Sequence, residues 1–246
     1  MSAGAAANGG PIRGGPICDG SLAARLRDAS PDAWQAFTDH AFVRQMADGS
    51  LPQACYKHFL IQDYLFLRHF ARAYALAVYK AEDLTEMRQA AATLDALINQ
   101  EMRLHVETCA GWGIDEAAMA ATPEARANMA YTRFVLETGV SGDLLDLLAA
   151  LAPCVLGYGE IGARLIADPA TRIEGNSYRE WIELYGGSDY QEVARDACDQ
   201  LDRVAGKRIG ADPEAGPRWS SLLATFQAAV GLEEGFWDMG MTPPAE

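Results

Sequence analysis

Hydrophobic residues recur every three or four positions along most of this chain, which is the spacing of an amphipathic helix. The alternation typical of β-strands is scarce, and short Gly, Pro, Asp and Ser signals separate the periodic segments. The pattern therefore predicts an all-α protein. We expect helices over residues 21–47 with an interruption near Pro31, after Pro52, over 84–109, from about 124 to 140, around Cys154 as far as about 168, from about 178 to 185, over 189–205 and over 217–239.

The chain is long enough for one large domain with a full core, and no break in composition marks a second one among its 246 residues. Residues 1–20 are rich in Gly and Ala and lack the apolar core of a secretory signal, so we expect a flexible tail followed by a helical domain over 21–246. The best apolar run, over 144–158, contains Asp146 and Pro153 and falls short of the roughly 20 residues that span a bilayer. We predict a protein that does not cross a membrane.

The cysteine content and the net charge indicate the cellular compartment and the chemical class of the binding partner. The five cysteines are scattered, odd in number and without a Cys-x-x-Cys pair, which is typical of free thiols in a reducing compartment. The formal net charge of −14 disfavours binding to nucleic acid or to an anionic membrane surface. We expect a cytoplasmic protein whose partner is a small neutral or cationic molecule.

Cys154 stands out because it follows Pro153 inside an apolar helical stretch. A proline removes a backbone donor and tends to bend a helix, so this thiol is expected beside disturbed backbone. Helical spacing places Gly157 and Tyr158 on the face of Cys154. A buried structural cysteine is the alternative that this local pattern leaves open.

Two acids occupy apolar helical faces, where an unpaired carboxylate costs several kcal/mol. Aromatic residues flank both Asp63 and Glu233 at helical spacing, although a modest rotation of the last helix would point Glu234 inward instead. Each acid is either a functional group or one partner of an internal salt bridge or cap.

Glu101 and His105 are four residues apart, so they could share a metal ion or hydrogen-bond to each other. A helical di-iron site normally needs Glu-x-x-His pairs on two helices, and the sequence has none. We therefore favour the hydrogen-bonded arrangement and expect neither a metal nor an organic cofactor. A Cys/His dyad has no support from sequence proximity, since every histidine lies in the first half of the chain.

The order of these motifs resembles that of the thiaminase II (TenA) family over residues 21–241. The landmarks, in chain order, are Gln62-Asp63, Glu101-Met102-x-x-His105, Tyr131-Thr132, Pro153-Cys154-x-x-x-Tyr158-x-Glu160-x-Gly162, Trp181-Ile182-x-x-Tyr185-Gly186-Gly187 and Glu233-x-x-Phe236-Trp237. The resemblance implies a single-domain helical bundle of the haem-oxygenase-like type. It also implies a homotetramer.

The resemblance further implies an enzyme of thiamine salvage that hydrolyses an aminomethylpyrimidine, or thiamine itself, at the carbon attached to ring position 5. Cys154 then corresponds to the nucleophile and Glu233, not Glu234, to the catalytic acid. Asp63 corresponds to the acid that holds the amino group and ring nitrogen of the pyrimidine. The implied pocket residues are Phe66, Tyr131, Tyr158 and Tyr185.

Two positions depart from the family pattern: the family often has tyrosine where this chain has Phe66 and tryptophan where it has Leu156. We expect these changes to affect the pocket wall and the substrate rather than the chemistry. The competing functions are a haem-oxygenase-like di-iron oxygenase, which would use Glu101 and His105, and a non-catalytic pyrimidine-binding protein.

Overall fold

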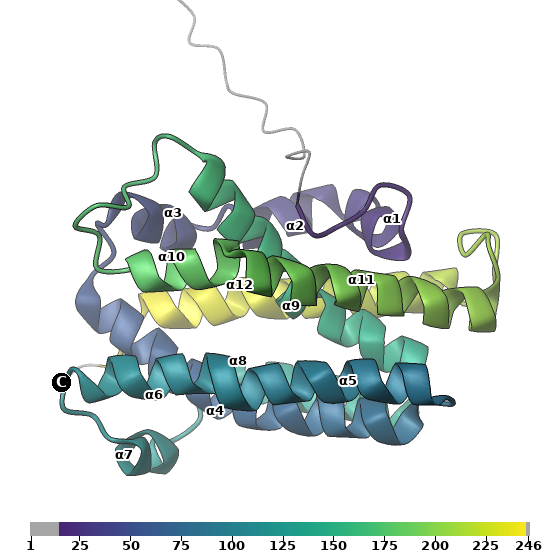
Figure 1. Ribbon diagram of the computed structural model, residues 1–246, viewed down its shortest axis with the longest axis horizontal. Helices are drawn as coiled ribbons and strands as arrows, with labels where there is room; N and C mark the ends of the chain where they lie inside the picture. Colours follow the sequence, from purple (N-terminus) through teal and green to yellow (C-terminus); the bar gives the residue numbers. More distant parts are fainter. Residues whose placement is uncertain (1–14, 245–246) are drawn as a thin grey trace, which may run out of the picture.

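A computed structural model describes residues 15–244, and within that range it contains helices and no strands (Figure 1). The elements are α1 (Leu22–Asp28), α2 (Pro31–Thr38), α3 (Ala41–Asp48), α4 (Gln53–Lys80), α5 (Leu84–Ala96), the π-helix η1 (Leu97–Glu101), α6 (Met102–Ala110), α7 (Glu116–Ala121), α8 (Arg126–Ser141), α9 (Leu144–Ala167), α10 (Arg179–Gly186), α11 (Ser188–Ile209) and α12 (Trp219–Met241). The all-α prediction is confirmed.

The helix boundaries differ from the sequence prediction in three places. The segment 21–47 forms three short helices, with Pro31 at the first position of α2 as expected, although the Ser30 side chain makes no capping hydrogen bond. The helix predicted over 84–109 contains the π-helical turn of η1, and α7 was not predicted. Short helices and local π-turns leave almost no trace in a three-to-four residue pattern.

Two long helices, α4 and α9, form the centre of the bundle. Helix α9 packs against α8, α10, α11 and α12, and α4 packs against α5, α6 and α8. In Figure 1, α5 and α6 follow one line below α11, and α12 lies behind α11. Part of α9 is apolar enough to cross a membrane, with a mean hydropathy of 1.6, but 83% of that window is buried in the protein. A long apolar helix that is mostly buried is typical of a protein core. The apolar segment is longer than the run over 144–158 that the sequence pattern indicated.

Close helix packing depends on glycine at two positions of α9. A β-carbon on Gly157 would lie 2.1 Å from the Phe37 ring, and one on Gly162 would lie 2.3 Å from the backbone of Tyr185. Such distances are far inside van der Waals contact, so only glycine lets α2 and α10 approach α9 this closely. Gly157 therefore makes room for Phe37, on the helix turn that follows Cys154.

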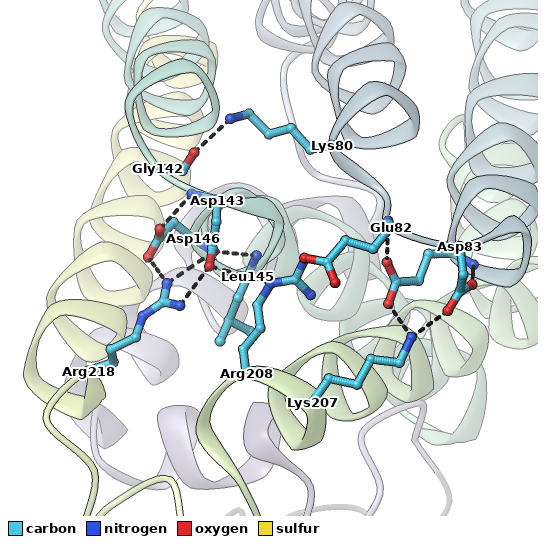
Figure 2. A network of polar contacts seen from close by, with 11 residues as sticks. Lys80, Glu82, Asp83, Gly142, Asp143, Leu145, Asp146, Lys207, Arg208 and Arg218 are labelled. Carbon is cyan, nitrogen blue, oxygen red and sulfur yellow. Dashed lines mark hydrogen bonds and ion pairs between the residues drawn. The ribbon is translucent and has the colours of Figure 1, made fainter.

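Charged residues hold the beginning of α9 against its neighbours (Figure 2). Asp143 caps α9 in a capping box with Asp146, and Arg218 donates to Asp143 at 2.7 and 3.0 Å and to Asp146 at 2.7 Å. Burial raises the pKa of Asp143, but the hydrogen bonds and charge of Arg218, together with the backbone N–H groups of Leu145 and Asp146, outweigh it and bring the pKa to about 2. Lys80 donates to the Gly142 carbonyl at 2.7 Å, which ties the end of α4 to the same corner. These contacts fix where the Cys154 helix begins.

Residues 1–14 of the predicted tail lie outside the described residues. Of the rest of that segment, Pro16 is buried and Ile17 is partly buried against the core. A β-carbon on Gly159 would lie 2.9 Å from Pro16, so the described part of the segment packs on α9.

Candidate functional site

Helix α9 places Cys154 at the edge of a cavity, immediately after the proline that interrupts the helical hydrogen bonds. The residue is partly exposed, whereas Cys55, Cys109 and Cys198 are buried, and all five cysteines are free as predicted. Burial of the sulfur raises the pKa of the Cys154 thiol well above its usual range, and the charges of Glu233, Glu101 and Asp63 raise it further. The resting sulfur is therefore a protonated thiol surrounded by acids.

Glu233, on α12, is the inward acid of the pair that the sequence pattern left open. It is 2% exposed, whereas Glu234 is partly exposed. The Tyr131 hydroxyl on α8 donates to the Glu233 carboxyl at 2.7 Å, which favours the ionised form. Burial outweighs this hydrogen bond and raises the pKa of Glu233 to about 8. A carboxyl with this pKa is an effective proton donor at neutral pH.

Asp63, on α4, pairs with His105 on α6, a contact that the sequence pattern did not predict. Asp63 Oδ2 and His105 Nε2 are 2.6 Å apart, and the other ring nitrogen, Nδ1, lies 2.8 Å from the backbone carbonyl of Glu101. A carbonyl only accepts, so we assign a proton to Nδ1. A second proton on Nε2 makes the ring an imidazolium that donates to Asp63, and the raised pKa of His105 favours that form. Burial lowers the pKa of His105, but the hydrogen bond and charge of Asp63 outweigh it and raise the pKa overall.

The predicted hydrogen bond between the Glu101 and His105 side chains is wrong, because His105 contacts only the backbone carbonyl of Glu101 and the two side chains point to different partners. The Glu101 carboxyl accepts a hydrogen bond from the Tyr185 hydroxyl on α10. Within residues 15–244, no three His, Cys, Asp or Glu side chains are grouped as metal ligands would be. If Asp63 were a purely structural acid, the sequence pattern predicted an internal salt bridge or a cap as its partner, with arginine as the cation. That prediction is wrong, because the partner is His105 on another helix.

Aromatic rings surround these acids. Phe66 lies 5.0 Å from Tyr131 between ring centroids, and Tyr158 lies 5.1 Å from Tyr185. All four residues are at most 4% exposed. The charge of Glu233 is among the causes that raise the pKa of Tyr131 and Tyr158. The structure therefore brings all seven predicted site residues into one region between α4, α8, α9, α10 and α12.

The cavity itself has a volume of about 260 Å³ and lies between η1 and the α10–α11 junction. Its lining comprises Phe70, Thr93, Ala96, Leu97, Gln100, Glu101, Cys154, Val155, Glu183, Leu184, Gly187, Ser188, Asp189, Tyr190 and Val193. Cys154 is the one predicted site residue in this lining, and the other six are buried residues that do not line the cavity. Sequence reasoning missed the cavity role of Phe70 and Tyr190. The Gly-Gly-Ser break before Tyr190 was the available signal, because backbone breaks often border a site.

The expected effect of Phe66 and Leu156 on the pocket wall stays a prediction, because neither residue lines this cavity. Leu156 is turned away from it. Its side chain borders a small void between α9 and α11, together with Tyr74 and Leu201. Two positions along a helix correspond to about 200° of rotation, which turns Leu156 away from the cavity that Cys154 borders.

Comparisons with known proteins agree with this architecture. The chain is 36% identical over 219 residues to the aminopyrimidine aminohydrolase of Halalkalibacterium halodurans, covering 89% of this chain and 95% of that protein. A TenA family transcription regulator from Silicibacter sp. TM1040 has a crystal structure that matches with a TM-score of 0.84 and 51% identity over 89% of this chain and 96% of that one. A domain of unknown function from Shewanella denitrificans, described as having a heme oxygenase-like fold, covers 87% of this chain and 89% of that one with a TM-score of 0.63 at 14% identity.

The last match shows the fold alone, and it confirms the predicted haem-oxygenase-like bundle. A model of the TENA/THI-4/PQQC family matches residues 27–242, which include every residue of the candidate site. The chain therefore belongs to the TENA/THI-4/PQQC family.

Proposed function

We propose that this chain is a hydrolase of thiamine salvage that converts 4-amino-5-aminomethyl-2-methylpyrimidine to its 5-hydroxymethyl counterpart, with thiamine as a second substrate. The observation that carries the proposal is a thiol at the edge of a 260 Å³ cavity with a buried acid of raised pKa beside it. The relative from Halalkalibacterium halodurans, named aminopyrimidine aminohydrolase, supports the same reaction.

The proposed reaction begins with addition of Cys154 across the ring. A bond forms between Sγ and ring C6 while Glu233 gives its proton to ring N1, and the thiol proton replaces the one that Glu233 has lost. The electron pair that N1 gains then returns through C2, N3 and C4 and expels the amine, leaving an exocyclic methylene. Water adds to that methylene, N1 loses its proton, and the C6–S bond breaks to release the alcohol.

The electrostatics of the site support these roles. A raised thiol pKa means that Cys154 needs a partner that accepts its proton as the bond forms, and Glu233 is such a partner once it has protonated the ring. Sulfur suits the step because it is both a good nucleophile and a good leaving group.

Asp63 is proposed to hold the amino group and a ring nitrogen of the pyrimidine, with Phe66, Tyr131, Tyr158 and Tyr185 as the surrounding walls. Asp63 is 4% exposed and already paired with His105. The proposal therefore requires side chains beside Cys154 to move aside when the ring enters. Small rotamer changes of this kind are common on binding.

A product assay tests the proposal. The purified protein is incubated with the aminomethylpyrimidine, its formylated form and thiamine in parallel, and the hydroxymethyl product is measured by chromatography. Formation of the alcohol from the first compound supports the proposal. Stoichiometric iron after purification without chelator, with no alcohol formed, would favour the di-iron oxygenase instead.

We also propose that the protein is cytoplasmic, which its free cysteines favour, and that it assembles as a homotetramer, by resemblance to the family. The acidic charge of −14 supports a partner that is a small molecule and not nucleic acid or a membrane. Light scattering on the eluted protein measures the mass of the assembly directly.

A further inference from the structure

Glu101 is a partly buried acid at the cavity that the mechanism above does not use. Together with Cys154 it belongs to the cavity lining, and its carboxyl accepts a hydrogen bond from the Tyr185 hydroxyl. Burial raises the pKa of Glu101 to about 7, and the negative charge of Asp63 acts in the same direction, against the opposing effects of His105 and Tyr185. Both the protonated and ionised forms are therefore accessible near neutral pH.

The backbone at Glu101 is also unusual. Residues Leu97–Glu101 form a π-helical turn inside an otherwise continuous α-helical run. Such turns are rare and are frequently found at functional sites. Here the turn directs Leu97, Gln100 and Glu101 to the cavity, while His105, one turn later, faces Asp63.

The charge of the cavity lining is one-sided. Its ionisable carboxylates are Glu101, Glu183 and Asp189, and the described lining contains no lysine, arginine or histidine. Glu183 is paired with Arg179 at 2.8 Å outside the cavity, and Asp189 is exposed. Glu101 is therefore the acid of this lining that is best shielded from solvent, and it would attract a positive group of a ligand bound next to Cys154.

We propose that Glu101 is a second acid–base residue of the site and contacts the leaving group. This inference rests on the proposed function. Ionised Glu101 binds the ammonium of the aminomethyl substrate. When the C–N bond breaks, ammonia departs with the bonding pair. Water then forms a C–O bond to the methylene and gives a proton to Glu101, which passes it to ammonia, so that ammonium is the final product.

Binding measurements separate this role from a structural one. Calorimetry in the Cys154→Ser background, which is expected to bind substrate without turnover, compares two ligands: the cationic aminomethylpyrimidine and the neutral hydroxymethylpyrimidine. Adding Glu101→Gln should weaken binding of the cation by at least about tenfold and change binding of the alcohol less than twofold, since a charged hydrogen bond is lost only with the cation. Glu107→Gln removes an exposed carboxylate from the following helix and should leave both affinities unchanged.

The outcomes distinguish the two proposals. Equal weakening of both ligands, or no weakening of the cation, overturns the role of Glu101 while the parent enzyme still turns over the aminopyrimidine. Absence of turnover by the parent enzyme overturns the proposed function itself. If Glu101→Gln does not fold, Glu101→Asp keeps the charge but moves it away from the cavity, and it must still weaken the cation more than the alcohol.

Discussion

Replacing Tyr131 with phenylalanine tests the acid role of Glu233. The Tyr131 hydroxyl donates to Glu233 at 2.7 Å and lowers the pKa of that carboxyl, which nevertheless reaches about 8. A hydrogen bond to an ionised group contributes about 1.5–3 kcal/mol, and 1.36 kcal/mol corresponds to one pH unit. Without this bond the pKa of Glu233 rises by about one pH unit or more. Because Glu233 must be protonated to act, activity should persist to higher pH.

The assay is kcat/KM for the aminomethylpyrimidine between about pH 6 and pH 10, where the alkaline limb reports the acid of the free enzyme. Tyr131→Phe lowers the maximum, since a wall of the pocket changes, but the position of the limb is the diagnostic quantity. Tyr64→Phe is the matched control, because the Tyr64 hydroxyl donates to Glu116 at 3.0 Å, outside the candidate site. A limb that stays in place or moves to lower pH in Tyr131→Phe would refute the reasoning.

Three further changes have defined outcomes. Glu233→Gln should lower kcat by about 10²- to 10⁴-fold, because the proton donor is lost. It should also speed alkylation of Cys154 by iodoacetamide, because a carboxyl that raises the thiol pKa is gone, and slower alkylation would contradict this. Asp63→Asn leaves its buried histidine partner without a carboxylate and should lower the free energy of unfolding in urea by about 3 kcal/mol; an unchanged midpoint would argue against the ion pair. Gly162→Ala should lower the free energy of unfolding by at least about 1–3 kcal/mol, because the new β-carbon clashes with the backbone of Tyr185. The control Gly231→Ala has open space around it and should raise the free energy of unfolding by up to about 1 kcal/mol, so equal effects would contradict the close packing at Gly162.

Most of the fold could be predicted from the sequence because long amphipathic helices carry a strong periodic signal. The start of α4 after Pro52 and the extent of α9 follow from proline, glycine and apolar spacing. The π-turn of η1 could not be predicted, since one extra residue in a turn changes the periodicity too little to see. It is nevertheless the feature that ends at Glu101, beside the cavity.

The candidate site was predictable only in part, for a related reason. A carboxylate in an aromatic stripe is visible in the sequence, so Asp63 and Glu233 could be singled out, but their partners lie on other helices. The His105 ring is 42 positions from Asp63, and the Tyr131 hydroxyl is 102 positions from Glu233. Only the packing of α4 with α6, and of α8 with α12, brings them together.

The central claim is that the sulfur of Cys154 bonds to the pyrimidine during turnover. Rapid quenching of the parent enzyme with excess aminomethylpyrimidine, followed by peptide mass spectrometry, measures this directly. The account predicts a pyrimidine adduct on the peptide that contains Cys154, and no adduct and almost no alcohol product with Cys154→Ser. Alcohol formed by Cys154→Ser at the parent rate, or an adduct found only on another cysteine, would contradict it.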